Sequence, residues 1–201
     1  MFGTSTGTAA SRMLSVIIAT LDSERPLVRT LATLVAGALD GLVSEVLVAD
    51  AGSRDETAQV ADAAGCNFIT VTGPPGRRLL AASRAARAPW LLFLHPGIGL
   101  EPSWVADVTA FMQETRAEAR AATFRRGTGT GPALRNIWRI VTAAIGGPHP
   151  AQGLLISKQF YGILGGHSDS ATDPEAELLR RIGRARLSLL PTGASAAGLD
   201  T

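Results

Sequence analysis

Four short apolar runs, separated by stretches with helical periodicity, constrain this chain more than any other feature of its sequence. Residues 13–20 (MLSVIIAT) are almost continuously apolar and rich in β-branched side chains, which is typical of a strand buried on both faces. Strands that alternate with helices at this spacing form a parallel, doubly wound α/β sheet. The other three runs cover residues 45–49, 67–72 and 90–94.

The stretches between these runs predict helices, because their apolar residues recur at helical spacing. Ligands of doubly wound sheets bind beyond the carboxyl ends of the strands. This places the expected site on the loops at residues 20–22, 50–55, 73–78 and 95–99. The predicted helices cover residues 23–39, 56–64, 79–87, 102–120, 134–145, 160–164 and 174–182, and two later strands cover 121–126 and 153–157.

The length of 201 residues suits a single domain. We expect this domain to span residues 13–192, between a disordered N-terminal tail over residues 1–12 and a flexible C-terminal tail over residues 193–201. The first tail is rich in Gly, Ser and Thr and lacks the apolar segment of a signal peptide. No apolar run in the sequence reaches the roughly 18 residues that span a bilayer, so a cytoplasmic location is expected.

Charge and cysteine content exclude some classes of function. The formal net charge is +2, whereas a nucleic-acid interface needs a clustered basic face. The one dense group of cations lies at residues 180–186, and we expect no nucleic-acid partner. A single cysteine, Cys66, cannot form an internal disulfide and is expected to pack in the core.

The predicted helix over residues 134–145 has two interpretations. Leu134, Ile137 and Val141 share one face, and this pattern indicates packing on the core. Trp138 and Arg139 on the same helix also suit a peripheral contact with a membrane surface or with the acceptor of a reaction. The sequence leaves both interpretations open.

The loops after the apolar runs carry motifs in a fixed order. These are residues 14–22 (LSVIIATLD), 45–57 (EVLVADAGSRDET) and 90–95 (WLLFLH). In this order the chain resembles the inverting family 2 glycosyltransferases of GT-A fold, and in particular a short bacterial subgroup with a Leu-His-Ala-Asp-Thr motif after its fourth strand. The resemblance covers residues 14–191 and implies a Rossmann-like, mostly parallel sheet with flanking helices.

The resemblance implies a nucleotide-sugar donor, UDP-linked, and assigns residues to it. Thr20 and Asp22 end the first strand, where the family contacts the base or ribose. Asp50 matches the aspartate that accepts a hydrogen bond from the base, a role suited to a carboxylate because it only accepts. Gly52 and Ser53 match the turn that lets the nucleotide approach the backbone.

Two arginines complete the implied nucleotide site. Arg77 matches the arginine near the diphosphate, and Arg78 lies beside it, where a guanidinium bonds phosphate oxygens in pairs. Plainer interpretations exist for the charged residues. Asp50 and Asp55 suit turn and N-cap positions, and the two arginines suit a solvated pair.

The segment His95-Pro96-Gly97-Ile98 stands where the family carries its acidic metal motif. The family binds Mg²⁺ or Mn²⁺ there because a hard cation prefers carboxylate oxygen and offsets the charge of the leaving diphosphate. Here the aspartate position falls on Gly97, and a lone His95 is a poor ligand for Mg²⁺. We therefore assign no metal ligand, and no cofactor follows from the sequence.

Two other acidic positions of the subgroup also differ. Ala151 replaces the aspartate of a Tyr-Gly-Asp-Gln-Gly motif, and the Glu-Asp pair that supplies the general base falls on Pro174-Glu175. Glu175 is the first candidate for that base and Asp173 is the second. Alternatively, Asp173 and Pro174 simply begin a helix as its N-cap and first residue.

The residues support two hypotheses about function. In the first, the chain is a glycosyltransferase that moves a hexosyl unit from a nucleotide-sugar to an unknown acceptor, weakly or without metal. Losing the metal would remove several kcal/mol of transition-state stabilisation. In the second, the chain is a catalytically inactive relative that binds nucleotide as a regulatory module. The sequence specifies neither the sugar nor the oligomeric state.

Overall fold

The computed structural model describes residues 13–126, 152–171 and 173–196. The predicted tail over residues 1–12, the predicted helix over 134–145 and Ala151 lie outside these residues, as do residues 197–201 of the predicted C-terminal tail. Within the described ranges, none of the helices combines the length and the apolar character that crossing a bilayer requires.

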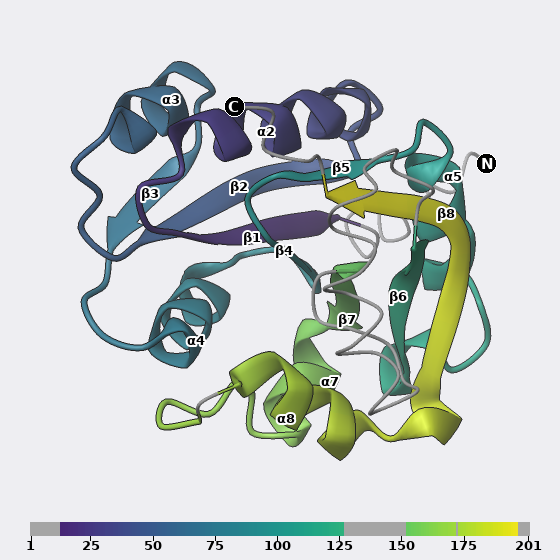
Figure 1. The fold of residues 1–201 in the computed structure, drawn as a ribbon. Coiled ribbons are helices and arrows are strands. Elements are labelled where there is room, and N and C mark those ends of the chain that lie inside the picture. Colours follow the sequence, from purple (N-terminus) through teal and green to yellow (C-terminus); the bar gives the residue numbers. More distant parts are fainter. Residues whose placement is uncertain (1–12, 127–151, 172, 197–201) are drawn as a thin grey trace, which may run out of the picture.

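The strands form one sheet in the order β3-β2-β1-β4-β7-β6-β8-β5 (Figure 1). Its parallel half consists of β1 (Leu14–Thr20), β2 (Val43–Asp50), β3 (Asn67–Thr70) and β4 (Trp90–Leu94). Its mixed half consists of β5 (Ile98–Leu100), β6 (Ala121–Arg126), β7 (Leu154–Ser157) and β8 (Leu187–Ala196). In that half β6 and β8 are parallel, and the other pairs are antiparallel. The predicted α/β class with a mostly parallel sheet is confirmed.

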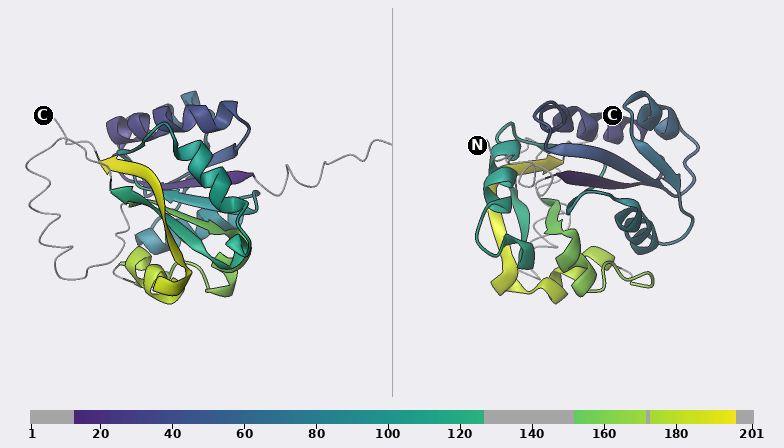
Figure 2. Two further views of the ribbon diagram at one scale, coloured as in Figure 1. Left: turned by 90° about the vertical axis from the view of Figure 1, so that its right-hand side faces the viewer. Right: turned by 180° about the vertical axis from the view of Figure 1, so that it is seen from behind.

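Helices cover both faces of the sheet, as the views from the side and from behind in Figure 2 also show. One face packs against α2 (Glu24–Leu39), α3 (Thr57–Ala63) and α5 (Trp104–Met112). The other face packs against α4 (Pro75–Ala85), α7 (Lys158–Ile163) and α8 (Pro174–Ile182). The core is therefore divided into two apolar layers, one on each side of the strands. The predicted packing of Cys66 is confirmed, since its side chain lies against the first layer.

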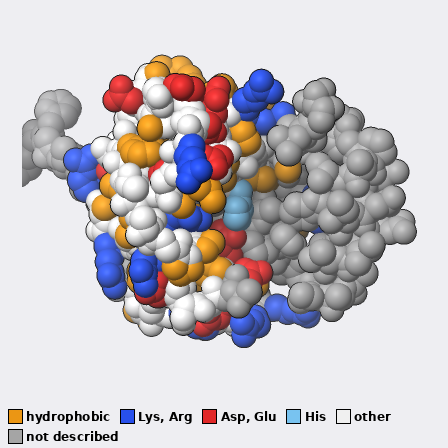
Figure 3. All heavy atoms as spheres, turned by 60° about the vertical axis from the view of Figure 1, so that its left-hand side comes forward, with side chains coloured by type: hydrophobic (Ala, Val, Ile, Leu, Met, Phe, Trp, Pro, Cys, Tyr) orange, Lys and Arg blue, Asp and Glu red, His pale blue; other side chains and the backbone are white. Residues whose placement is uncertain are grey.

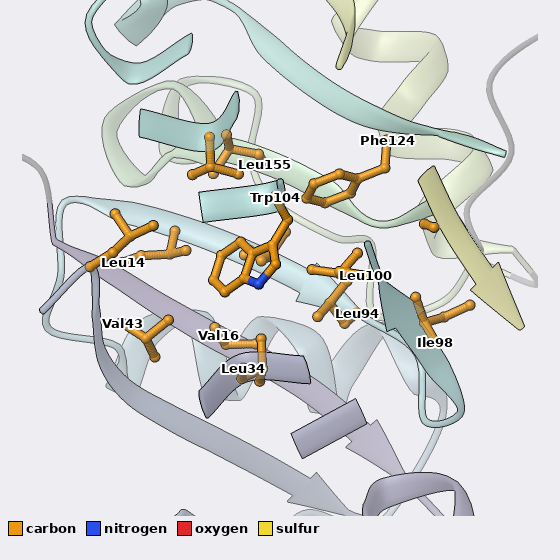
Figure 4. Close-up of a cluster of buried hydrophobic side chains, with 14 of the residues drawn as sticks. Leu14, Val16, Leu34, Val43, Leu94, Ile98, Leu100, Trp104, Phe124 and Leu155 are labelled. Atoms are coloured by element: carbon orange, nitrogen blue, oxygen red, sulfur yellow. The ribbon is translucent and has the colours of Figure 1, made fainter. Parts of the chain in front are cut away.

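Trp104 is a buried tryptophan of the first layer, and it fixes α2 and α5 to the sheet (Figure 4). Only 1% of its surface is exposed, and its indole N–H donates to the Thr33 carbonyl at 3.0 Å. Gly37 of α2 makes room for the ring, because a Cβ at that position would overlap the indole. Phe124 and Leu155 extend the same cluster toward β6 and β7.

Two predictions about irregular segments are wrong. The loop predicted over residues 95–99 contains the start of β5, and residues 193–196 of the predicted flexible tail belong to β8. The two segments pair with each other, with Ile98 opposite Ala196 and Leu100 opposite Ala194. Small residues such as Gly99 and Ser195 pair through the backbone here, and the side chains of Ile98 and Leu100 are buried in the first apolar layer.

Two helix boundaries also differ from the prediction. The helix predicted over residues 102–120 ends at Met112, and Arg116 then takes a left-handed φ of 66°, which an α-helix does not continue. A short 3₁₀ turn (Ala117–Ala119) leads into β6. In contrast, α4 begins at Pro75, earlier than residue 79, because proline suits the first turn of a helix. Arg77 and Arg78 therefore lie in a helix and not in a loop.

Candidate active site

Asp50, the last residue of β2, organises the loop that follows it. Its Oδ1 accepts hydrogen bonds from Thr20 Oγ1 (2.8 Å) and Ser53 Oγ (2.5 Å), and its Oδ2 accepts from the N–H groups of Gly52 and Ser53 (2.7 Å each). Burial alone would raise the pKa of Asp50, but these hydrogen bonds outweigh it and lower the pKa. The four acceptor positions of the carboxylate are thus filled from within the chain.

Asp22 joins the end of β1 to the same loop. Its N–H donates to Ser53 Oγ at 2.8 Å, and its Oδ1 accepts from the Arg54 N–H at 2.8 Å. Its φ of 46° is left-handed, a conformation that aspartate tolerates better than most residues. The residues predicted for nucleotide binding at the ends of β1 and β2 therefore form one hydrogen-bonded cluster: Thr20, Asp22, Asp50, Gly52 and Ser53.

Asp55 has a structural role at a turn, in agreement with the turn or N-cap position that the sequence suggested for it. Its Oδ2 accepts from the Glu24 N–H at 2.9 Å, and its Oδ1 accepts from the Thr57 N–H at 3.1 Å. These bonds join the first turn of α2 to the first turn of α3. Asp55 thus holds two helix starts together.

The first turn of α4 carries both arginines predicted for the diphosphate, and their environments differ. Arg77 is half-exposed and pairs with Asp169 through Nε to Oδ1 (2.8 Å) and Nη2 to Oδ2 (3.2 Å). Arg78 is buried, and its Nε has no hydrogen-bond partner in the described part of the chain. Burial lowers the pKa of Arg78, although the charge of Asp50 opposes this. Arg78 is thus a buried cation near the Asp50 cluster.

The turn from β4 to β5 lies against α2. Gly97 has a φ of 90°, and its N–H donates to the Pro26 carbonyl and to Thr30 Oγ1, at 2.9 Å in each case. Thr30 Oγ1 also lies 3.3 Å from the His95 carbonyl, to which it donates. The backbone of this turn is therefore held by α2.

The first residues of α8 are those predicted to supply the general base. Asp173 is the N-cap, and its Oδ1 accepts from the Ala176 N–H at 2.9 Å. Pro174 is the first helical residue and is buried. The interpretation of these two residues as a helix start is confirmed. Glu175 follows in the first turn, with 15% of its side chain exposed.

His95 and Glu175 meet although they are 80 residues apart, with His95 Nε2 lying 2.6 Å from Glu175 Oε2. Burial lowers the pKa of His95, but the hydrogen bond to Glu175 and the charges of Glu175 and Asp173 outweigh it, so the pKa is raised. This favours an imidazolium that donates to the carboxylate. The other carboxylate oxygen, Oε1, accepts no hydrogen bond from the residues that the structure describes.

His167 was not among the predicted site residues, yet it lies close enough to both His95 and Glu175 for their charges to act on it. His167 is 1% exposed; Tyr161 Oη lies 2.8 Å from its Nδ1 and accepts its backbone N–H at 2.9 Å. When the hydroxyl donates to Nδ1, the ring proton lies on Nε2, and in either tautomer Nε2 has no partner among the described residues. Burial lowers the pKa of His167 to about 4. The only sequence signal for this residue is the Gly-Gly turn directly before it.

The side chains near the end of β4 do not fit the cation that the family uses. His95 is paired with Glu175, and Gly97 supplies no side-chain oxygen. Over residues 13–126, 152–171 and 173–196, no three His, Cys, Asp or Glu side chains are grouped so that they could hold a metal ion. Mg²⁺ and Mn²⁺ prefer several oxygen ligands, so this set of donors disagrees with a resident divalent cation.

The surface charge of the described residues is mixed on the face drawn in Figure 3. Arginine and lysine side chains are scattered among acidic and apolar ones, and a histidine reaches the surface beside an acidic group. No continuous basic field covers the coloured part of that face.

A family model described as "Glycosyl transferase family 2" matches residues 15–167, which is more than half of the 201 residues. The matched stretch contains the Asp50 cluster, both arginines of α4, His95 and, at its last position, His167. Glu175 and α8 follow it. A comparison with curated proteins finds no match.

Solved structures of similar fold include several of glucosyl-3-phosphoglycerate synthase from Mycobacterium tuberculosis. Its complex with phosphoglyceric acid has a TM-score of 0.72 at 19% identity, and the match covers 95% of this chain and 74% of that chain. Its complex with Mn²⁺, UDP-glucose and phosphoglyceric acid has a TM-score of 0.68 at 19% identity, over 96% and 75% of the two chains. At these identities the likeness shows the fold alone, and it confirms the predicted GT-A type.

Proposed function

This chain belongs to glycosyl transferase family 2, and from that membership we propose that it transfers a hexosyl unit from a UDP-linked sugar to a hydroxyl acceptor. The observation that carries the proposal is the His95–Glu175 pair, which holds a carboxylate at the carboxyl edge of the sheet. The complex of the similar synthase with UDP-glucose supports a UDP-linked donor. The transfer relies on arginine and not on a divalent cation.

Glu175 acts as the general base. The acceptor oxygen attacks the anomeric carbon while the bond from that carbon to the diphosphate oxygen breaks, and the nucleoside diphosphate leaves with the bonding electrons. Glu175 Oε1 takes the hydroxyl proton, while His95 donates to Oε2 and fixes the carboxylate. A positioned base contributes about 10²- to 10⁴-fold to such a step. Asp173 is less suited, because its Oδ1 already caps α8.

Arg78 and Arg77 offset the charge of the leaving diphosphate. Arg78 is a buried guanidinium whose Nε lacks a hydrogen-bond acceptor within the described ranges, and a polar group buried in this way is unfavourable. Phosphate oxygens would supply the missing acceptor, and guanidinium groups bind them in pairs. Arg77 adds a second, more exposed cation on the same turn of α4.

The nucleoside lies against the Asp50 cluster. No atom of the described residues lies within 4 Å of the position that a Cβ would take at Gly52, so a ligand can approach the backbone there. Asp50 accepts from the base only if one of its four present bonds breaks. Asp22 and Thr20 flank this opening at the end of β1, as the family pattern implies.

Calorimetric titration with UDP and UDP-glucose tests the proposal, in EDTA and again in Mn²⁺. We expect binding of both ligands with the same dissociation constant in the two buffers, because arginine supplies the positive charge. Binding that requires Mn²⁺ would contradict the metal-free site. No binding of either ligand would contradict the donor assignment.

A catalytically inactive nucleotide-binding module is the second candidate. It is favoured by the glycine at the family's metal position and by the filled acceptor positions of Asp50. Hydrolysis of UDP-glucose separates the two candidates once binding is established. Slow hydrolysis that depends on Glu175 supports the transferase, and binding without any hydrolysis or transfer supports the module.

A further inference from the structure

The loop after Gly166 lies on the first turn of α4 and brings Asp169 to Arg77. The guanidinium faces the carboxylate with two parallel hydrogen bonds, of 2.8 and 3.2 Å. The backbones are in close contact, because a Cβ on Gly76 would overlap the Ser168 carbonyl. The stem of Arg77 lies over Gly73, where a Cβ would be 3.3 Å from Arg77 Cδ.

Two parallel N–H···O bonds are the geometry with which a guanidinium also binds phosphate. We propose that Asp169 is an internal stand-in for the donor diphosphate: it occupies Arg77 in the free protein, gives way when the donor binds, and so lowers donor affinity. This inference rests on the proposed function, because it takes Arg77 as a ligand of the diphosphate.

The ion pair is suited to displacement. The side chains of Arg77 and Asp169 are 53% and 50% exposed, and exposed ion pairs contribute little to stability. The carboxylate of Asp169 makes no other hydrogen bond within the described residues, so rotation of its side chain releases Arg77. A diphosphate brings more negative charge and more acceptor oxygens than one carboxylate does.

Protonation does not relieve this competition near neutral pH. The hydrogen bond from Arg77, followed by the charges of Arg77 and Arg84, lowers the pKa of Asp169 below its ordinary value. The carboxylate therefore stays charged under conditions in which the donor binds. After displacement it lies close to the bound diphosphate and repels it, which lowers the affinity further.

Asp169→Asn tests the stand-in directly, because asparagine keeps the size of the side chain and removes its charge. We expect UDP and inorganic pyrophosphate to bind about three- to tenfold more tightly to this variant at fixed ionic strength. In an Arg77→Ala background the same substitution has no comparable effect, because the guanidinium for which Asp169 and the diphosphate compete is absent. Asp40→Asn, at the C-cap of α2, is the matched control for loss of one negative charge.

The two ligands separate failure of the stand-in from failure of the proposed function. UDP that binds equally well, or more weakly, to Asp169→Asn overturns the stand-in and leaves the donor assignment intact. Tighter pyrophosphate binding to the variant, with no UDP binding to either protein, supports the stand-in and removes the UDP-linked donor. Pyrophosphate binding that is absent from both proteins, or unchanged between them, overturns the stand-in.

Discussion

Strand β2 carries a buried carboxylate near each of its ends, Glu45 and Asp50, and their surroundings differ. Glu45 accepts from Ser15 Oγ and the Arg87 N–H (2.6 Å each), from Arg87 Nε (3.0 Å) and from Asn67 Nδ2 (3.2 Å). Burial alone would raise the pKa of Glu45, but these hydrogen bonds outweigh it and lower the pKa. The network joins three strands to the connection between α4 and β4.

At the carboxyl end, the acceptor positions of Asp50 are also all filled by hydrogen bonds, but several polar groups around it have no hydrogen-bond partner. Arg78 Nε and His167 Nε2 are buried without partners in the described part of the chain, and Glu175 Oε1 accepts no hydrogen bond there. Unpartnered buried groups lower stability unless a ligand satisfies them. The comparison indicates that the amino end of the sheet stabilises the fold and that the carboxyl end retains capacity for a ligand.

The largest expected effect is on catalysis at the carboxyl end. Glu175→Gln should lower the rate of hexosyl transfer or donor hydrolysis by about 10²- to 10⁴-fold, because the amide cannot take the acceptor proton. Urea unfolding should show little change. Glu177→Gln, on the same helix and 3.9 Å from Arg181, is the matched control and should keep the rate. Equal rates in all three proteins would remove Glu175 from the base role.

The next effect is on stability at the amino end. Glu45→Gln should lower the free energy of unfolding by about 3 kcal/mol, because the amide presents a donor where Glu45 accepts from Asn67 and Arg87. Urea unfolding measures this, with the exposed Asp62→Asn as control. UDP affinity of the folded fraction should not change. A loss of UDP affinity without a loss of stability would reverse the assignment of roles to the two ends.

His167 should make the carboxyl end sensitive to acid. Its pKa of about 4 lies below that of an unfolded histidine, so the fold loses stability as the pH falls from 6.5 toward 4. We expect a loss of about 2 kcal/mol by pH 4.5 from this residue. His95 acts with the opposite sign: its raised pKa gives stability that is present below pH 6.5 and is lost as the pH rises above that value.

Urea unfolding at pH 7 and pH 4.5 measures the difference, and His167→Asn is the variant to compare. Its amide oxygen can accept from the Tyr161 hydroxyl in place of Nδ1, and it does not titrate. The acid-dependent loss should shrink in this variant. An identical pH dependence in both proteins would show that His167 is not held neutral by the fold.

The smallest expected effect concerns the exposed partner of Glu45 at the amino end. Arg87→Ala should lower the free energy of unfolding by less than about 1 kcal/mol, because the Arg87 side chain is 78% exposed and the backbone N–H still bonds Glu45. A loss as large as that of Glu45→Gln would show that the ion pair, and not the buried hydrogen bonds, dominates the network. Both variants are measured in the same urea titration.

The parallel half of the fold is predictable from sequence because its strands are continuous apolar runs. Every residue of β4 is buried, and nearly all of β1 is as well. The start of β5 and the end of β8 are not predictable in this way, because β5 has only three residues and because Gly99, Gly193 and Ser195 interrupt any continuous apolar run. Edge strands of this kind are specified by their partners more than by their own sequence.

The candidate site also has a part that local sequence predicts and a part that it does not. The Asp173 cap and the Asp50 turn follow from local patterns, because each bonds to neighbours in the chain. The pairs His95–Glu175 and Arg77–Asp169 join positions 80 and 92 residues apart, so only tertiary packing reveals them. The position of the His167 ring is set by Phe93, whose ring centroid lies 4.8 Å from that of His167, and by the contact with Tyr161 Oη. No local sequence pattern predicts these contacts.

The backbone at Gly97 has a consequence for anyone who would redesign this protein. A φ of 90° is strained for any residue with a Cβ, and the N–H is committed to Pro26 and Thr30. A single Gly97→Asp change would therefore not recreate an acidic metal motif, because the turn must first be released from α2. Building a carboxylate site at this turn therefore requires coordinated changes in two segments of the chain, the turn between β4 and β5 and the start of α2.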